Sequence, residues 1–480
     1  MRVKYTDISL NISIFVLSNT RIMSKDKTKT VNTKISENKF TQTTLFSLSD
    51  VGKKKTEVRF VTEHISSDGG LLFLKEVDKN IGLIDSIAAC LDDQRHASYV
   101  KHDIKSLLSQ RIMQIAAGYE DANDCNTLRN DGVLKICCET EDSLSAQPTM
   151  SRFENSISNK ELYQISQVLV DQFIASYTKA PEVIILDCDD TAARVYGEQQ
   201  LSLFNNYYGD YCFMPLHIYE GLSGKLIASI LKPGRRSKSV KVFGILRRLI
   251  EHLRNIWPNT LIILRGDSHF CSQEFMDWAV TEYNIGFITG LTSNNLLKEM
   301  TRTTIESAER EYKTYQKPLK RYHSFPYKAA SWQHFQRVVV KVEVSDQGTN
   351  VRYIVSNIHC IRAKALYENA YCARGSAELR IKDHKTYLKS DRMSCNSFKA
   401  NQFRLLLHSA AYVLMHTLQK QVLTSTEFAN STMKTIQLKI LKIATRVKIL
   451  KTKVKIEFPV EFPEIQIFKN LLLLFQELRI

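Results

Sequence analysis

Three short stretches of this sequence place carboxylates where they could do chemistry. VIILDCDDT is an apolar run that ends in Asp187, Asp189 and Asp190, and LIILRGD is a second apolar run that ends in Asp267. The third stretch, YCARGSAELRIKDHK, holds Glu378 among basic side chains. Burial of a carboxylate is unfavourable unless the group is paired or binds a metal. The stretches therefore indicate either a shared metal site or ordinary turns, caps and ion pairs.

Each aspartate stretch by itself also fits a structural role. The first could form a turn and a helix N-cap, and the Gly-Asp-Ser of the second is a common turn. Within the first stretch, period-2 alternation puts Asp187 and Asp189 on the same face of a strand, so either could be the chemical group. Two apolar strands that end in aspartate are more informative together, because open α/β sheets build their sites at the carboxyl ends of strands.

The third stretch, read as a helix, gathers one carboxylate, one aromatic ring and several cations on a narrow face. Counted at about 100° per residue, that face holds Tyr371, Arg374, Glu378 and Lys385 within about 60°, with Lys382 on the same stripe. An ion pair between Arg374 and Glu378, worth a few tenths of a kcal/mol, explains two of these residues. It does not explain the rest of the stripe, nor Gly375, which costs about 1 kcal/mol relative to alanine inside a helix.

Combined, the stretches predict a carboxylate triad from two strands and one helix. Carboxylate oxygens suit octahedral Mg²⁺ or Mn²⁺, with water and a substrate phosphate at the remaining positions. Two such ions about 3.5–4 Å apart can activate a water or a 3′-hydroxyl and stabilise the leaving oxygen of a phosphodiester. The tyrosine, arginine and lysine beside the glutamate would then hold DNA phosphates.

The surrounding pattern predicts an α/β unit that positions these groups. Strands are expected at 183–190, 261–267 and 286–291, a β-hairpin at 213–221 and 225–234, and helices at about 239–256 and around Phe275. A basic, aromatic segment (293–358) follows and closes with two β-patterned runs, RVVVKVEV and VRYIVSNI, before the glutamate helix.

These residues resemble a DDE-type insertion-sequence transposase of the cut-and-paste branch. The Tyr-(2)-Arg-(3)-Glu-(6)-Lys signature of that branch matches Tyr371, Arg374, Glu378 and Lys385, and its first aspartate commonly stands in an Asp-x-Thr/Ser context, as in Asp189-Asp190-Thr191. The resemblance implies an RNase H-like mixed sheet flanked by helices. It also implies that Asp189, with Asp187 as the fallback, joins Asp267 and Glu378 to hold Mg²⁺ or Mn²⁺, as two ions.

The resemblance further implies the activity and the partners. The enzyme would bind the terminal inverted repeats of its own element, cleave the ends and join them to target DNA, as a homodimer in the paired-end complex, in the bacterial cytoplasm at the nucleoid. The segment before Glu378 would correspond to the β-rich insertion of the family, where Trp332 is the candidate for stacking on a flipped base. A core tryptophan is the alternative for that residue.

The charge of the chain agrees with a polyanionic partner. Of 480 residues, 66 are Lys or Arg and 50 are Asp or Glu, a net charge of +16. Between Lys434 and Lys455 there are eight basic residues and no acidic one. Within this stretch, an apolar stripe from Ile436 to Leu450 predicts a helix that presents Lys439, Lys442 and Arg446 to DNA. A solvated lysine face and a membrane surface are weaker alternatives. No apolar run approaches the ~20 residues that span a bilayer.

The predicted organisation divides the chain into segments. They are a disordered leader (1–58, with translation starting at Met1 or Met23), a helical DNA-binding domain (59–178), a catalytic core in two parts (179–292 and 359–425), the β-rich insertion (293–358) and a basic C-terminal tail (426–480). Strong amphipathic helices are expected over 104–115 and 162–173. The ten cysteines show no CxxC pair and no metal-ligand spacing, which favours reduced thiols.

Two functions besides transposition fit the same sequence. One is a catalytically inactive descendant of a transposase that binds DNA as a repressor. The other is a different RNase H-like nuclease that selects DNA by structure. Cleavage that depends on the repeat sequence separates the three.

Overall fold

The computed structural model describes residues 46–58, 64–235 and 242–477, in two compact units, Met1–Glu63 and His64–Ile480. In the first unit, β1 (Phe46–Val51) and β2 (Lys54–Val58) pair as an antiparallel hairpin, whose turn places Gly52 at a φ of 63°. The end of the expected disordered leader, residues 46–58, is therefore ordered β structure. The rest of that leader, including Met23, lies outside the described residues.

The second unit is built on an eight-stranded mixed sheet in the order β12-β13-β14-β11-β10-β4-β8-β9. Its strands are β4 (Val183–Asp190), β8 (Leu216–Glu220), β9 (Leu226–Ile230), β10 (Leu261–Gly266), β11 (Ile285–Leu291), β12 (Leu319–Tyr327), β13 (Gln336–Ser345) and β14 (Gly348–Ser356). The central strands β4, β10 and β11 are parallel, and all other pairs are antiparallel. The mixed sheet expected from the sequence is confirmed.

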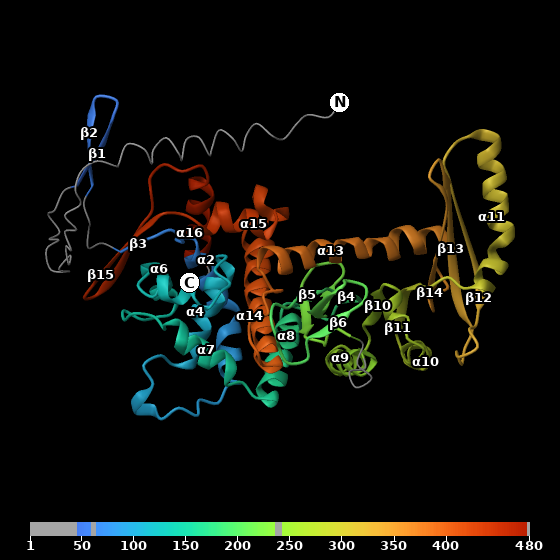
Figure 1. Ribbon diagram of the computed structural model, residues 1–480, viewed down its shortest axis with the longest axis horizontal. Helices are drawn as coiled ribbons and strands as arrows, with labels where there is room; N and C mark the ends of the chain where they lie inside the picture. The colour runs from blue at the N-terminus through green and yellow to red at the C-terminus, as the bar shows by residue number, and fades with distance from the viewer. Residues whose placement is uncertain (1–45, 59–63, 236–241, 478–480) are drawn as a thin grey trace, which may run out of the picture. The chain divides into compact units, whose positions relative to one another are not determined.

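Alternate residues of the strands face two helical layers. Ile184, Leu186 and Cys188 of β4 pack in one core with helices α8 (Asn159–Ala175), α9 (Val242–Ile256), α10 (Gln273–Thr281) and α11 (Asn295–Tyr315). A continuous helical segment crosses the opposite face (Figure 1). It consists of α12 (Ala363–Ala365), η3 (Leu366–Tyr371), η4 (Cys372–Arg374), α13 (Gly375–Lys382) and η5 (Asp383–Tyr387). Because side chains alternate along a strand, Asp187 and Asp189 face this second layer.

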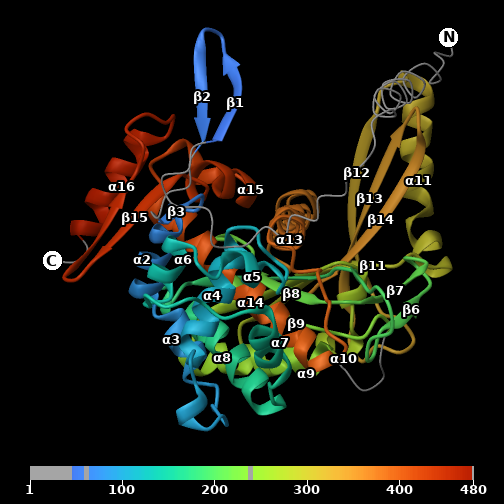
Figure 2. The same ribbon diagram turned by 60° about the vertical axis from the view of Figure 1, so that its left-hand side comes forward.

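The segment 293–358 contains more than β structure. It begins with α11, and its strands β12–β14 extend the main sheet through the pairing of β14 with β11, so that α11 lies against β12 and β13 (Figure 2). Val338, Val340 and Val342 pack towards α11, whereas Val339 packs on the other face with Leu366. Apolar residues on both faces make β13 a buried strand, which favours its joining the central sheet.

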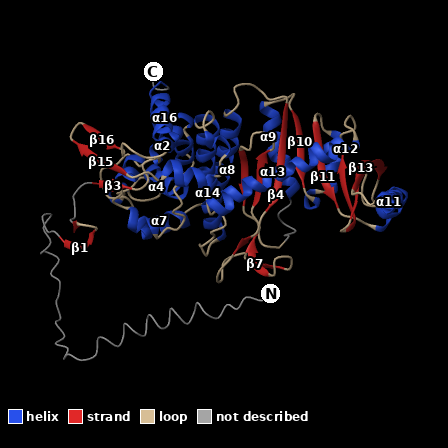
Figure 3. Ribbon diagram, turned by 90° about the horizontal axis from the view of Figure 1, so that it is seen from above, coloured by secondary structure: helices blue, strands red, loops and turns tan. Residues whose placement is uncertain are grey.

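A helical part adjoins the β9 end of the sheet (Figure 3). It contains α2 (Leu71–Ile81), α3 (Leu83–Ala88), α4 (Ile104–Ala116), α5 (Asp124–Leu128), α6 (Gly132–Cys137), α7 (Gln147–Asn155), α14 (Phe398–Thr417), η6 (Leu418–Val422) and α16 (Ile465–Glu477). The helices predicted over 104–115 and 162–173 are confirmed as α4 and α8. The helices of this part contribute to one hydrophobic core around α14. The buried carboxylate of Glu154 in α7 pairs with Arg111 of α4 at 2.8 Å and with Arg404 of α14 at 3.0 Å. These ion pairs join α4 and α7 of the helical part to α14.

The prediction of one helix through 434–450 is wrong beyond residue 441. Helical turns cover α15 (Met433–Ile436) and η8 (Gln437–Leu441), after which β15 (Thr445–Leu450) pairs with β3 (His64–Ser66) and with β16 (Lys453–Glu457). The β-branched residues Thr445, Val447 and Ile449 alternate with polar ones, a pattern that suits a half-buried strand. Within the described ranges, no helix is both long and apolar enough to cross a membrane.

Candidate active site

The two parallel strands β4 and β10 bring their terminal aspartates together. Cys188 of β4 lies opposite Gly266 of β10, and the next residues along are Asp189 and Asp267. Neighbouring strands are about 4.8 Å apart, so the two carboxylates lie at the same edge. Burial raises the pKa of Asp189 to about 6, and the negative charge of Asp267 adds to this rise, while Arg374 opposes it. The sheet thus concentrates negative charge at this edge.

The helical segment over this face supplies the third carboxylate. Arg374 lies between Asp189 and Glu378, with Nη1 3.3 Å from Asp189 Oδ2 and Nη2 3.4 Å from Glu378 Oε1. The side chain of Asp189 is 17% exposed and that of Glu378 is 63% exposed. Asp189, Asp267, Arg374 and Glu378 all line one groove of about 1000 Å³. The structure therefore assembles the three predicted acidic residues around a single groove, with an arginine among them.

The remaining residues of the signature reach the same edge by different turns. Tyr371 ends a π-helical turn, and its hydroxyl occupies space that Gly290 of β11 leaves open, 3.0 Å from where a Cβ would stand. Lys385 lies in a second π-helical turn and donates to Thr191 Oγ1 at 3.2 Å and to the carbonyl oxygen of Ala192 at 2.5 Å. Lys382 is exposed. The turns thus depart from a uniform 100° per residue, yet Tyr371, Arg374 and Lys385 all face the strand ends.

Two further residues of the site were not singled out by the sequence. Lys232, just after β9, binds both carboxylate oxygens of Asp190, at 2.6 and 2.7 Å. His269 donates its backbone N–H to Asp267 Oδ1 at 2.8 Å, and its Nδ1 lies 3.0 Å from Oδ2. The position of Lys232 depends on the β8–β9 hairpin, which returns the chain to the end of β4.

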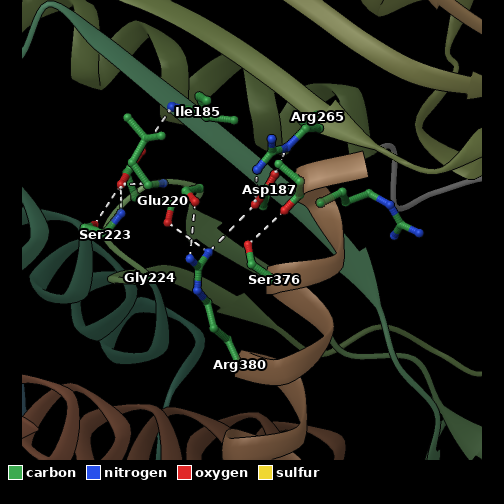
Figure 4. A network of polar contacts seen from close by, with 12 residues as sticks. Ile185, Asp187, Glu220, Ser223, Gly224, Arg265, Ser376 and Arg380 are labelled. Atoms are coloured by element: carbon green, nitrogen blue, oxygen red, sulfur yellow. Dashed lines mark hydrogen bonds and ion pairs between the residues drawn. The ribbon is translucent and has the colours of Figure 1, made fainter. Parts of the chain in front are cut away.

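Asp187, the fallback for the first carboxylate, is buried in a separate network (Figure 4). Its side chain is 0% exposed and accepts from Arg265 Nε at 2.5 Å and Nη2 at 2.7 Å. Arg380 Nη1 lies 3.8 Å from Asp187 Oδ2, and Arg265 Nη1 donates to the carbonyl oxygen of Ala370 at 2.6 Å. Arg265 and Arg380 therefore join β4 and β10 to the helical segment that carries Glu378.

The same network extends to the β8–β9 turn. Arg380 donates to the carbonyl oxygens of Glu220 at 3.1 Å and Gly221 at 3.2 Å. The buried Glu220 carboxylate accepts from the backbone N–H of Ser223 at 2.6 Å and from that of Ile185 at 3.3 Å. Gly224 has a φ of 80°, and a Cβ there would stand 2.8 Å from Arg380 Nε. The network fixes α13 against the sheet two residues beyond Glu378.

The acidic groups fit a hard divalent cation in type, although they do not enclose one as they stand. Among residues 46–58, 64–235 and 242–477, no three His, Cys, Asp or Glu side chains converge closely enough to hold an ion. Arg374 bridges Asp189 and Glu378, and its guanidinium competes for the oxygens that an ion would take. Carboxylates are the ligands that Mg²⁺ and Mn²⁺ prefer. Binding would therefore need Arg374 to release at least one carboxylate.

Other predicted DNA contacts lie in different surroundings. Trp332 is 9% exposed and packs edge-on against Tyr327 with ring centroids 5.3 Å apart, which favours the core alternative. Its stacking on a base stays a prediction. Lys442 lies 2.9 Å from buried Asp68 and over the ring of Tyr119. Its ammonium therefore has an internal partner. The exposed cations Lys439 and Arg446 pair with Glu464 at 3.2 Å and Glu457 at 3.8 Å.

Comparison with known proteins matches most of the chain to one family model. The family model described as "Transposase DDE domain group 1" matches residues 48–480. A cryo-EM structure of a piggyBac transposase synaptic complex with hairpin DNA covers 79% of this chain and 82% of its own, at 11% identity and a TM-score of 0.42. That likeness is too slight to support an argument about this chain. No curated protein matches.

Proposed function

The chain belongs to the transposase DDE domain family, and we propose that it cleaves the DNA ends of its own insertion sequence and joins them to target DNA. The observation that carries this proposal is the meeting of Asp189, Asp267 and Glu378 around one groove, from two strand ends and one helix. Members of such a family act on DNA with the help of divalent metal ions. The net charge of +16 suits a polyanionic substrate.

In the proposed reaction, Asp189, Asp267 and Glu378 would hold Mg²⁺ or Mn²⁺, as two ions. A divalent ion bound there would activate the attacking water or 3′-hydroxyl and stabilise the leaving oxygen. Arg374, Tyr371 and Lys385 line the same edge and would bind the phosphates that flank the cut. Arg374 would exchange its carboxylate partners for a phosphate, since the guanidinium fork binds either anion.

Recognition of the terminal repeats would use a second, basic groove in the helical part. This groove, of about 840 Å³, is lined by Arg95, Lys101, Arg129, Arg152 and Lys160. Burial lowers the pKa of His102 in the same groove, and the neighbouring cations Lys101, Arg129 and Arg95 add to the effect. Asp92, Asp93 and Glu161 also line the groove, so basic side chains are in modest excess there, which supports phosphate binding. Two ends would be held by a homodimer.

The decisive experiment replaces Glu378 by Gln in the full chain and follows nicking of DNA that carries the element's ends, with Mg²⁺ or Mn²⁺. We expect cleavage to fall by roughly a thousandfold or more, because a metal-binding carboxylate is lost. DNA affinity should stay close to that of the unaltered protein. Glu427→Gln, at an exposed glutamate outside the groove, is the matched control.

Each other outcome identifies a different function. Unchanged cleavage by the Glu378→Gln variant would refute the assignment of the site. Failure of the unaltered protein to nick any DNA with either metal would indicate a repressor without catalysis. Cleavage that follows DNA structure rather than repeat sequence would indicate another RNase H-like nuclease.

A further inference from the structure

The chain between β4 and β8 forms a small sheet that carries exposed aromatic rings. Its strands are β5 (Ala193–Arg194), β6 (Leu203–Asn205) and β7 (Asp210–Phe213), in the order β5-β7-β6, and it projects from the large sheet (Figure 3). Five exposed aromatic side chains lie on it or beside it: Tyr196, Phe204, Tyr207, Tyr208 and Tyr211. A cluster of exposed rings of this size marks a binding surface more often than a chance feature of the surface.

Two of these rings line the candidate active site itself. Tyr207 is 88% exposed and Tyr208 is 40% exposed, and both line the groove that contains Asp189, Asp267 and Glu378. Burial and the adjacent Tyr207 raise the pKa of Tyr208, and the charges of Asp189 and Asp190 add to this rise. The two rings therefore share one groove with the carboxylates.

The turn that carries the two rings is held in one conformation. Asn205 Oδ1 accepts from the backbone N–H of Tyr207 at 3.0 Å and of Tyr208 at 3.4 Å, and Gly209 closes the turn with a φ of 63°. Asn205 Nδ2 donates to the carbonyl oxygen of Gly234 at 2.7 Å. A Cβ on Gly234 would stand 2.1 Å from the carbonyl oxygen of Cys212, so only glycine allows this close approach.

We propose that Tyr207 and Tyr208 form a stacking platform for unpaired nucleobases of the DNA strand whose phosphodiester lies at the carboxylates. The ring centroids are 4.9 Å apart with an interplanar angle of 87°, so the two faces point in different directions and offer separate surfaces to bases. Base–aromatic stacking is tolerant of sequence and suits single-stranded DNA. The proposal rests on the proposed function, because it assumes that the groove receives DNA.

The occupant is argued from the position of the rings. A protein partner seated on the tyrosines would cover the groove that the substrate must enter. Unpaired bases, by contrast, continue the same DNA strand whose phosphates the acidic edge and Arg374 would engage. The small sheet is also joined to the end of β9 through the bridge between Phe213 and Pro233, which keeps it near Lys232.

The test measures binding of the full chain to a short single-stranded oligonucleotide that carries 2-aminopurine, and to the same sequence as a blunt duplex. Tyr207→Ala is the first variant, because a ring 88% exposed contributes little to folding. We expect the affinity for the single strand to fall by roughly tenfold and the fluorescence quenching of the stacked base to be lost. The duplex affinity should change much less.

Two controls keep the result specific. Tyr207→Phe retains the ring and should retain both affinity and quenching. Tyr283→Ala removes a ring that is 70% exposed outside the groove, and it should have no effect on either DNA.

Unchanged single-strand binding by the Tyr207→Ala and Tyr208→Ala variants would contradict the stacking platform, and so would an equal loss of affinity for the duplex. A change of oligomeric state in these variants would also contradict it, because it would assign the rings to a protein contact. These failures leave cleavage by the unaltered protein intact. Failure of the proposed function would instead appear as absence of nicking with the unaltered protein itself.

Discussion

Asp187 and Asp189 are two residues apart on the same face of β4, yet they lie in opposite electrostatic surroundings. Both oxygens of Asp187 accept from Arg265, with Arg380 nearby. Asp189 lies 3.3 Å from Arg374, which it shares with Glu378. Burial raises the pKa of both carboxyls, and at Asp187 the hydrogen bonds from Arg265 oppose the rise, whereas at Asp189 the pKa reaches about 6.

The difference shows how one strand can serve stability and chemistry in turn. A buried carboxylate with a bidentate arginine is internally neutralised and holds two strands and a helix together. A carboxylate that is only partly compensated retains unsatisfied negative charge, which a divalent cation can neutralise. On this comparison we propose Asp187 as a positioning residue and Asp189 as the residue that would touch the substrate or the metal.

The largest effect should come from Asp187→Ala. It leaves Arg265 buried without its carboxylate, and breaking a buried ion pair destabilises a protein by about 3–5 kcal/mol. Urea unfolding of the full chain measures this loss. Replacing both partners, as Asp187→Leu with Arg265→Met, should recover much of the stability, because apolar groups of similar volume can substitute for a buried pair. If the free energy of unfolding falls by less than about 1 kcal/mol in the Asp187→Ala variant, the structural role given to Asp187, and with it the contrast with Asp189, is wrong.

Asp189→Asn should instead stabilise the metal-free protein at neutral pH. The carboxyl has a pKa of about 6 in the folded protein and an ordinary value of 3.8 when unfolded. Because the folded protein binds this proton more tightly, the free energy of unfolding falls as the pH rises from about 4 to about 6. Above pH 6 the ionised carboxylate lowers the free energy of unfolding by about 1–3 kcal/mol. Asparagine removes this penalty.

The measurement for this variant is the urea midpoint at pH 4 and at pH 8. The gain over the unaltered protein should be present at pH 8 and absent at pH 4. Mg²⁺ should stabilise the unaltered protein by binding its folded state, and it should stabilise the Asp189→Asn variant less. An equal gain at both pH values, or equal stabilisation by Mg²⁺, would contradict the role given to Asp189.

The smallest effects extend the comparison to the basic tail. Lys442→Ala removes the partner of buried Asp68 and should destabilise the fold by about 1–3 kcal/mol. Lys439→Ala removes a more exposed ammonium, 53% exposed, from Glu464, whose side chain is 9% exposed, and should destabilise the fold less than Lys442→Ala does. If Lys439 contacts a phosphate, its loss should reduce the salt dependence of DNA binding by about one unit in slope. The reverse order of stability effects would contradict the structural role of Lys442.

Local pattern predicted those elements whose residues repeat with one clear period. The strand endings LDCDD and LRGD, the hairpin between them and the helices over 104–115 and 162–173 all appear where the sequence placed them. The helix predicted through residue 450 failed because its apolar spacing fits a helix and a strand equally well until pairing with β3 and β16 decides between them. Trp332 was ambiguous for a similar reason, since an indole is used both in cores and on stacking surfaces.

By itself, the sequence determined the chemical inventory of the site: two aspartates at strand ends, a glutamate on a basic helix and a surplus of positive charge. It could not decide between Asp187 and Asp189, because alternation gives both the same face. The tertiary structure distinguishes the two by placing Arg265 beside Asp187 and Asp267 beside Asp189, which favours Asp189 in the proposed site. It likewise brought Lys232 and the rings of Tyr207 and Tyr208 to the groove from segments whose own patterns carry no sign of it. Contacts between distant segments depend on strand order and register, and these are set by packing of the whole sheet rather than by any local run of residues.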